Sequence, residues 1–286
     1  MTQRRPSQPE SADDLLTRLG RLAAQARVGA ELQHARVELA EALQRELLPA
    51  SLPALPGLRT AARYSPARHG LDIGGDWYDA FATPDGALGF SIGDVQGHDV
   101  EAAAFMGQIR IALRAVAAFA PDPGEALAQA NDLLLSMHRD LFATCSFLRF
   151  DPTTWVLESA RAGHVPAIWA TVDGRYGISE DEGGLPLGML PGSSYPVTRH
   201  RLSTAGAYVL VTDGVVEGPS FPIEAGLERV ARVVAAGAGA EPAELAAAVM
   251  KVADCTGHQD DSAVLVLRYD PPPDPPPDSP PAVLPG

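Results

Sequence analysis

The residues best suited to chemistry are aspartates that sit at the ends of apolar, strand-like runs. Asp76 lies in GGDWYD, Asp94 in SIGDVQGH, Asp213 in VLVTDGV, and Asp260 in HQDDSAVLVL with Asp261 beside it. Hard divalent cations such as Mg²⁺ or Mn²⁺ prefer several oxygen ligands, and rigid strand ends can aim carboxylates at one point. Each aspartate alone is also ordinary turn chemistry. Four such positions, in a sequence without a zinc-type Cys/His cluster, favour a metal centre.

Composition narrows the class of protein. The chain has 286 residues, of which 46% are apolar and 20% charged, as expected for a globular protein with a core. Its formal net charge of -14 argues against a nucleic-acid or anionic-membrane surface, because both partners would be repelled. No apolar run is long enough to span a bilayer, and the N-terminus lacks a signal-peptide pattern, so we expect a cytoplasmic protein. Cys145 and Cys255 form no motif and are expected to be reduced, in or near the core.

The pattern of elements predicts an α+β fold with antiparallel sheets, because strands come in runs and helices in pairs. Leu88, Phe90 and Ile92 alternate as one face of a strand. Asp173-Gly174 predicts a hairpin with a type I′ turn between two further strands. Strand patterns also cover 142–150, 155–160, 167–172 and 175–178, and helical patterns cover 100–119, 123–138, 227–234 and 242–252. The helix over 123–138 begins with an Asp122 cap, Pro123 and Glu125.

The N-terminal region, up to Leu48, reads as one long amphipathic helix that ends at prolines 49, 53 and 56. Two interpretations stay open: the helix packs on its own domain, or it pairs with a second copy as a coiled coil. We therefore divide the chain into a helical segment (1–48), a main domain (49–270) and a disordered proline-rich tail (271–286).

Several motifs occur together in a fixed order. They are Gly74-Gly75-Asp76-Trp77-Tyr78-Asp79, Ile92-Gly93-Asp94-Val95-Gln96-Gly97-His98, Ala162-Gly163-His164-Val165-Pro166, Leu185-Pro186-Leu187-Gly188, Thr212-Asp213-Gly214 and Asp260-Asp261. Together with the preceding stretch 43–58, they resemble the metal-dependent protein phosphatase (PPM, type 2C) family, and most closely its bacterial SpoIIE/RsbU-like branch. The resemblance covers about residues 43–269.

The resemblance implies a four-layer α-β-β-α sandwich of two antiparallel sheets flanked by helices, with an N-terminal helix. It also implies a site for Mn²⁺ or Mg²⁺, with two ions expected. Asp94 would bridge both ions, Val95 would offer its carbonyl, and Asp76, Asp213 and Asp260 would complete the set; Asp261 is the less favoured member of its pair. Such ions would activate water for attack on a phosphoserine or phosphothreonine.

Other polar residues in these motifs have more than one interpretation. His98 and His164 could act as general acids, but bracing of loops and strand ends by hydrogen bonds is the favoured role. Arginine suits phosphate recognition because its guanidinium binds in a bidentate manner. The sequence leaves open whether Arg63, Arg68 or Arg110 has that role.

The resemblance implies a protein serine/threonine phosphatase that acts on a bacterial regulator, namely a phosphorylated STAS-type anti-sigma-factor antagonist. A homodimer through the N-terminal helix is a further expectation. Two alternatives remain: a catalytically weak scaffold with this fold in a partner-switching pathway, or a hydrolase of small phosphoesters.

Overall fold

The computed structural model describes residues 16–31, 47–66, 74–97, 100–137, 141–257 and 260–272. Within them the strands form two five-stranded antiparallel sheets, with the orders β1-β10-β9-β6-β7 and β2-β3-β4-β5-β8. We name them the β10 sheet and the β3 sheet.

The bounds of the elements follow the chain in order. The β10 sheet contains β1 (Leu58–Ser65), β6 (Ile168–Thr171), β7 (Tyr176–Ile178), β9 (Gly206–Val211) and β10 (Ser262–Tyr269). The β3 sheet contains β2 (Trp77–Ala82), β3 (Leu88–Val95), β4 (Ala143–Asp151), β5 (Val156–Ala162) and β8 (Thr198–Arg201). The helices are α2 (Val100–Ala117), α3 (Pro123–Ser136), α4 (Asp213–Val216), α5 (Ile223–Ala236), α6 (Pro242–Met250) and the 3-10 helix η1 (Lys251–Cys255).

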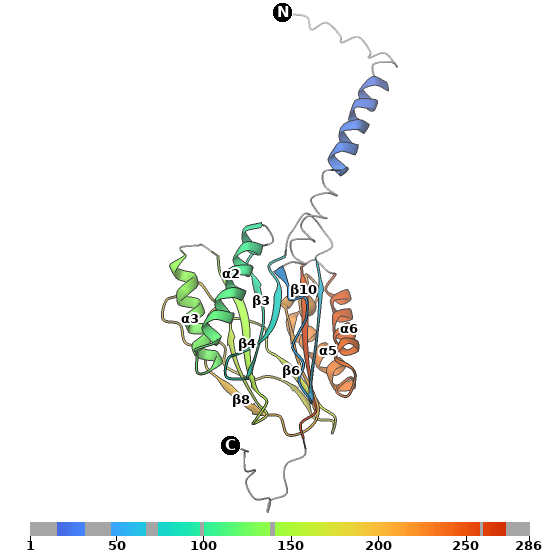
Figure 1. Ribbon diagram of the computed structural model, residues 1–286. Coiled ribbons are helices and arrows are strands. Elements are labelled where there is room, and N and C mark those ends of the chain that lie inside the picture. The colour runs from blue at the N-terminus through green and yellow to red at the C-terminus, as the bar shows by residue number, and fades with distance from the viewer. Residues whose placement is uncertain are drawn as a thin grey trace, which may run out of the picture.

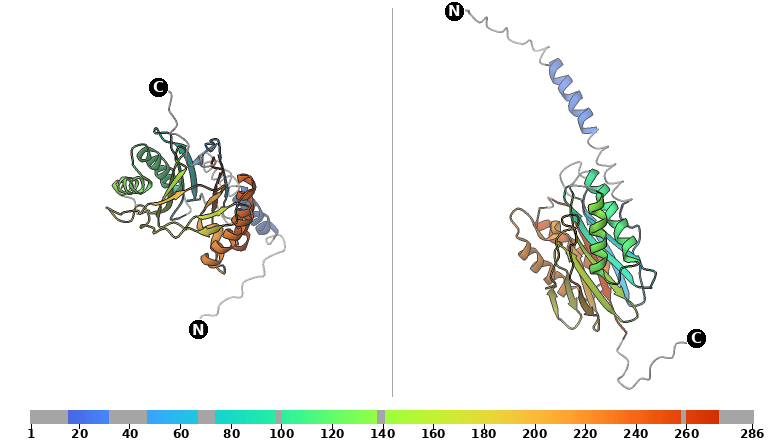
Figure 2. Two further views of the ribbon diagram at one scale, coloured as in Figure 1. Left: turned by 90° about the horizontal axis from the view of Figure 1, so that it is seen from below. Right: turned by 90° about the vertical axis from the view of Figure 1, so that its left-hand side faces the viewer.

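The two sheets stack face to face, and a pair of helices covers each outer face. Figure 1 shows α2 and α3 beside the β3 sheet and α5 and α6 beside the β10 sheet, and the views in Figure 2 show the same layers. The predicted four-layer sandwich of antiparallel sheets is therefore confirmed. Most predicted helices end within a few residues of the observed bounds; the pattern over 227–234 belongs to the longer α5.

Alternation along the strands separates the two faces of each sheet. In β3, Leu88, Phe90 and Ile92 all point into the core between the sheets, as their spacing predicts. Leu148 in β4 joins the same core, whereas its neighbour Phe147 faces the helices. Each strand therefore supplies side chains to two hydrophobic layers.

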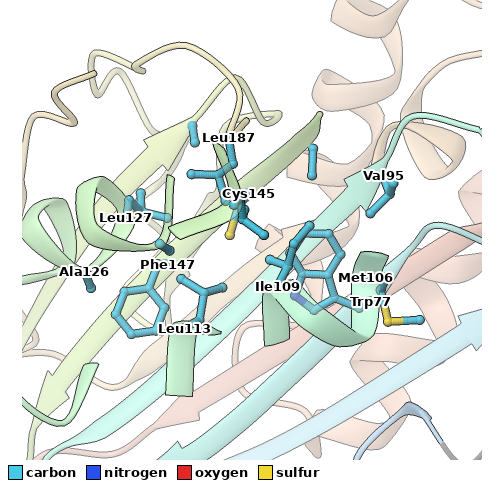
Figure 3. Close-up of a cluster of buried hydrophobic side chains, with 14 of the residues drawn as sticks. Trp77, Val95, Met106, Ile109, Leu113, Ala126, Leu127, Cys145, Phe147 and Leu187 are labelled. Atoms are coloured by element: carbon cyan, nitrogen blue, oxygen red, sulfur yellow. The ribbon is translucent and has the colours of Figure 1, made fainter. Parts of the chain in front are cut away.

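The helices cover the outer faces by burying apolar side chains against the strands. Figure 3 shows Met106, Ile109 and Leu113 of α2 gathered with Trp77 and Phe147 of the β3 sheet. On the other side, residues of α5 and α6 pack on the outward side chains of β9 and β10. Burial of large apolar side chains, at roughly 25 cal/mol per Å², holds the layers together.

The start of α3 is built as the sequence predicts. The side chain of Asp122 accepts a hydrogen bond from the Glu125 backbone N–H at 2.9 Å, and Pro123 occupies the first turn. This cap satisfies an amide that has no partner within the helix.

The hairpin between β6 and β7 is confirmed, but its predicted turn type is wrong. A type I′ turn needs positive φ at both central residues, whereas only Gly174 has one, at 93°, and Asp173 does not. The Gly174 N–H donates to the Thr171 carbonyl at 3.0 Å, and the Thr171 N–H donates to the Arg175 carbonyl at 2.8 Å. This is the three-residue loop in which a single glycine takes the left-handed position.

The N-terminal helix is confirmed for residues 16–31, all of which are exposed. In Figure 1 this helix stands apart from the sandwich, so this stretch does not pack on its own domain. Its exposed apolar side chains are Leu16, Leu19, Leu22 and Val28. Residues 1–15 and 32–46 of the predicted helical segment, and most of the predicted tail, lie outside the described residues.

Both cysteines are free, as expected. Cys145 is buried between β4 and the helices, but Cys255 is exposed at the end of η1, so its predicted position in or near the core is wrong. The error arises because the absence of a cysteine motif indicates a free thiol but does not determine whether that thiol is buried. Within the described ranges, no helix combines the length and apolar character needed to cross a membrane.

Candidate metal centre

The sequence-predicted aspartates all lie at one end of the sandwich. Asp76 precedes β2, and Asp94 is near the end of β3, which pairs antiparallel with the start of β2. Asp213 follows the end of β9, and Asp260 precedes the start of β10, its antiparallel neighbour. In both sheets, antiparallel pairing thus brings the end of one strand beside the start of its neighbour. In both sheets this happens at the same end of the sandwich.

Asp76 and Asp94 are the two members of this group whose pKa values burial raises most clearly. Burial raises the pKa of Asp76 well above its ordinary value, and the charges of Asp94, Asp261 and Asp213 raise it further. Burial also raises the pKa of Asp94, to about 8, together with the charges of Asp213 and Asp260; a hydrogen bond with the Asp76 side chain acts in the opposite direction. These two carboxyl groups are therefore close enough to interact directly.

Asp213 has an acceptor atom without a partner. Its Oδ1 is buried and makes no hydrogen bond, and burial followed by the charge of Asp260 raises its pKa. A buried carboxylate oxygen without a donor is costly unless a cation satisfies it. This orphaned atom is an observation in favour of a bound cation.

The glycine pair before Asp76 leaves room for oxygen atoms. A Cβ on Gly75 would lie 2.4 Å from the Val95 carbonyl oxygen and 3.0 Å from Asp94 Oδ1. A Cβ on Gly74 would lie 2.0 Å from Asp261 Oδ2. Any larger residue would therefore push into the space that these oxygens face, which explains why this loop has two glycines.

The members of the acidic pair differ in their surroundings. Asp261 is buried and its charge acts mainly on Asp76, whereas Asp260 is exposed and its charge acts on Asp94 and Asp213. The Oδ1 of Asp260 also accepts a hydrogen bond from the Asp261 N–H at 2.8 Å. The two members of the pair therefore act on different predicted ligands: Asp260 on Asp94 and Asp213, and Asp261 mainly on Asp76.

The donor set fits Mg²⁺ or Mn²⁺, because it consists of carboxylate oxygens and a backbone carbonyl. Among the residues with described positions, however, no three His, Cys, Asp or Glu side chains are gathered tightly enough to hold one ion. The carboxylates share one electrostatic environment but do not form a finished ligand cage. The assignment of Asp76, Asp94, Val95, Asp213 and Asp260 as ligands therefore stays a prediction.

Thr212 is a site residue that has no assigned role in the sequence analysis. Its Oγ1 donates to Asp76 Oδ2 at 2.7 Å and accepts from the Ala263 N–H at 2.8 Å. Thr212 follows β9 in one sheet, while Asp76 precedes β2 in the other. The hydroxyl therefore fixes the orientation of a buried carboxylate across the two sheets, and only its place before Asp213 could have drawn attention to it.

Asp79, at the end of the first glycine-containing motif, is a buried carboxylate that pairs with two arginines of α2. Arg114 donates to it with Nε and with a terminal nitrogen, each at 2.7 Å, and Arg110 lies 3.3 Å away. Arg110 is therefore engaged with Asp79. Of the other candidates for phosphate recognition, Arg63 lies in β1 and Arg68 lies outside the described residues.

His164 has the bracing role that the sequence analysis favours. It is buried, with Nδ1 2.8 Å from Thr144 Oγ1 and Nε2 3.1 Å from the Val211 carbonyl oxygen. Burial lowers its pKa to about 3. A neutral histidine with both nitrogens engaged is poorly placed to donate a proton to substrate. His98 lies outside the described residues.

The layers and the end at which the carboxylates gather define a PP2C-type phosphatase fold. The structure of the RsbU and RsbW domains of Rv1364c from Mycobacterium tuberculosis is 33% identical, with a TM-score of 0.70 over 79% of this chain and 64% of that one. The SiaA-PP2C domain of Pseudomonas aeruginosa shares the fold at a TM-score of 0.66 and 23% identity, over 87% of this chain and 99% of that one.

The family model for stage II sporulation protein E (SpoIIE) matches residues 84–270, and the chain belongs to this family. It is 29% identical over 214 residues to protein IcfG of Synechocystis sp. (strain ATCC 27184 / PCC 6803 / Kazusa), covering 64% of this chain and 33% of IcfG. It is 25% identical over 182 residues to phosphoserine phosphatase RsbU of Bacillus subtilis (strain 168), covering 63% of this chain and 53% of RsbU. The chain thus spans about a third and about half of the lengths of these relatives.

Proposed function

We propose that this protein is a metal-dependent protein serine/threonine phosphatase that hydrolyses phosphoserine or phosphothreonine on a bacterial regulatory protein. The observation that carries the proposal is the group of Asp76, Asp94 and Asp213 at one end of a PP2C-type sandwich, where burial first, and the charges of neighbouring carboxylates second, raise the pKa of each. Such mutual repulsion is a cost that a divalent cation removes.

Asp76, Asp94, Asp213 and Asp260, with the Val95 carbonyl, would hold two ions of Mn²⁺ or Mg²⁺. When bound, the ions supply a Lewis acid that activates water and neutralises phosphoryl charge. The raised pKa of Asp94 means that the side chain must lose a proton before it can bind a cation. Thr212 holds Asp76 in one orientation throughout, because its hydroxyl is fixed by the Ala263 N–H.

The domain division follows from this assignment. Residues 49–270 would form the phosphatase domain, 1–48 a helical segment and 271–286 a proline-rich tail. The exposed leucines of the helix over 16–31 support a homodimer through this segment, since an apolar stripe on a helix is stable when a second helix covers it. Light scattering of a protein lacking residues 1–42 tests the pairing: a monomer is expected, and an unchanged mass would contradict it.

The substrate we propose is a phosphorylated STAS-type anti-sigma-factor antagonist. Similarity to phosphoserine phosphatase RsbU and to a protein that joins RsbU and RsbW domains supports a place in partner switching. An antagonist of this kind acts on transcription, so the proposal places the phosphatase in the cytoplasm.

The test is phosphate release from a phosphorylated STAS protein, with and without Mn²⁺. We expect release that requires Mn²⁺ and that Asp94→Asn abolishes, while Asp173→Asn, at an exposed aspartate of the distal hairpin, leaves the rate unchanged. No release from any phosphoprotein despite bound Mn²⁺ would indicate a scaffold with this fold. Faster release from nucleotides or p-nitrophenyl phosphate than from the protein would indicate a hydrolase of small phosphoesters.

A further inference from the structure

His164 lies in the loop between β5 and β6, where it is 3% exposed. Its two ring nitrogens contact different sheets: Nδ1 contacts the hydroxyl of Thr144 in β4, and Nε2 contacts the backbone carbonyl of Val211 in β9. One side chain therefore spans the space between the two sheets at the end that carries the aspartates.

The chemistry of these partners fixes the proton on the ring. A carbonyl oxygen can only accept a hydrogen bond, so Nε2 carries the proton and donates it to Val211. In a neutral imidazole the other nitrogen is then an acceptor, and Thr144 must donate its hydroxyl proton to Nδ1. Both bonds are satisfied in one tautomer only, so the contact is directional.

The partners of His164 are neighbours of the proposed ligands. Thr144 is the direct partner of Asp94 in the pairing of β3 with β4. Val211 lies two residues before Asp213, and the intervening Thr212 holds Asp76. A shift of His164 would therefore move Asp94 relative to Asp213, which belong to different sheets.

The loop that carries His164 is itself held in place. Arg161 donates to the His164 carbonyl at 2.7 Å with one terminal nitrogen and to the Asp181 carbonyl at 2.7 Å with the other. Gly163 has a φ of 64°, and a Cβ there would lie 2.6 Å from Pro186 Cγ. Contacts on the loop and on both ring nitrogens therefore hold the imidazole in one position.

We propose that His164 is a positioning residue: through Thr144 and Val211 it sets the separation of Asp94 from Asp213, and thereby the affinity of the proposed centre for divalent cations. This inference rests on the proposed function. Metal–oxygen distances in Mg²⁺ sites tolerate little deviation, so the spacing of the two sheets is a direct determinant of binding.

The test compares Mn²⁺ binding by calorimetry in the full chain and three threonine variants. Thr144→Val keeps the shape of the side chain but removes the donor to His164, whereas Thr144→Ser keeps the hydroxyl. Thr171→Val is the matched control, because Thr171 is a buried strand residue with a hydrogen-bonded hydroxyl, at the opposite end of the sandwich. All variants are also measured by thermal unfolding.

We expect Thr144→Val to raise the dissociation constant for Mn²⁺ about ten-fold, at the lower end of the effects known for groups that orient metal ligands. Thr144→Ser should restore the affinity. Thr171→Val should lower the melting temperature without changing the affinity for Mn²⁺. Equal Mn²⁺ affinity in all three variants would overturn the inference while leaving the proposed function intact. A wild-type protein that binds no Mn²⁺ would overturn both, and the two failures are therefore distinguishable.

Discussion

The hydroxyl of Thr212 donates a hydrogen bond to the carboxylate of Asp76 at 2.7 Å, although 136 positions separate the two residues in the chain. The bond joins the end of β9 in one sheet to the start of β2 in the other. The same oxygen accepts the Ala263 N–H at 2.8 Å, so the hydroxyl is fully engaged and cannot rotate away. Asp76 is thereby held in place before any cation binds.

Replacing Thr212 by valine should destabilise the protein. Two buried groups, the Asp76 carboxyl and the Ala263 N–H, would lose their partner, at a cost of about 1–3 kcal/mol each in the free energy of unfolding. Urea unfolding monitored by circular dichroism measures this cost. Thr212→Ser keeps the hydroxyl and should stay close to wild type; equal losses in the two variants would show that the methyl group, and not the hydrogen bond, matters.

The metal-free protein should lose stability as pH rises. The pKa of Asp94 in the folded protein is about 8, against an ordinary value of 3.8, so in this window the folded state holds a proton that the unfolded chain has released. Its contribution is full below pH 3.8 and is lost progressively up to about pH 8, at about 1.4 kcal/mol per pH unit for a fully shifted group.

Asp94→Asn is the comparison that isolates this contribution, since the amide does not titrate. Unfolding free energies of both proteins between pH 5 and pH 8.5 should diverge, with the wild type falling relative to the variant. Saturating Mn²⁺ should abolish the fall in the wild type, because the bound cation stabilises the ionised carboxylate. Parallel curves for the two metal-free proteins would argue against a buried, protonated Asp94.

His164 should give a pH dependence of the opposite sign. Burial lowers its pKa to about 3 from 6.5, so the folded state keeps the ring neutral where the unfolded chain takes up a proton. The contribution is complete above pH 6.5 and is lost as pH falls from 6.5 to about 3. The difference in unfolding free energy between wild type and His164→Gln should therefore shrink on acidification. A constant difference would mean that folding does not lower the pKa of the ring.

The ion pair between Asp79 and Arg114 should be important for stability. Asp79 is buried, and its carboxylate accepts two hydrogen bonds of 2.7 Å from the guanidinium of Arg114. Removing the carboxylate charge would weaken both hydrogen bonds. We expect Asp79→Asn to cost about 1.5–3 kcal/mol, the range for hydrogen bonds to charged groups, because Arg114 is partly exposed and can be solvated once the carboxylate is gone. The exposed pair of Asp173 and Arg175 is the control, and Asp173→Asn should leave the unfolding free energy close to that of the wild type. Similar effects at both positions in denaturant melts would contradict this account.

The sequence was sufficient to predict the local features of the fold. Alternation of Leu88, Phe90 and Ile92 predicts the strand face that the structure confirms, and Asp122 caps α3 as expected. These features depend on neighbouring residues, where side-chain direction and backbone amides are fixed by spacing alone. The hairpin at Gly174 was also predictable, but its turn type was not, because Asp-Gly serves in more than one kind of loop.

Contacts between segments that are distant in the chain could not be predicted from the sequence. No local pattern shows that Thr212 reaches Asp76, that Arg114 pairs with Asp79, or that His164 spans the two sheets. Such pairs depend on strand order and register, which are set by the packing of the whole sandwich. The sequence placed the aspartates at strand ends, and the antiparallel topology brings those ends together.

The most direct test of the account is a crystal of the full chain grown with Mn²⁺ and measured at the manganese absorption edge. We predict anomalous peaks for two ions among the carboxylates of Asp94, Asp76, Asp213 and Asp260, with the Val95 carbonyl as a ligand. Clear density for these side chains without an anomalous peak between them, or manganese bound only elsewhere, would contradict the claim that they form a metal centre.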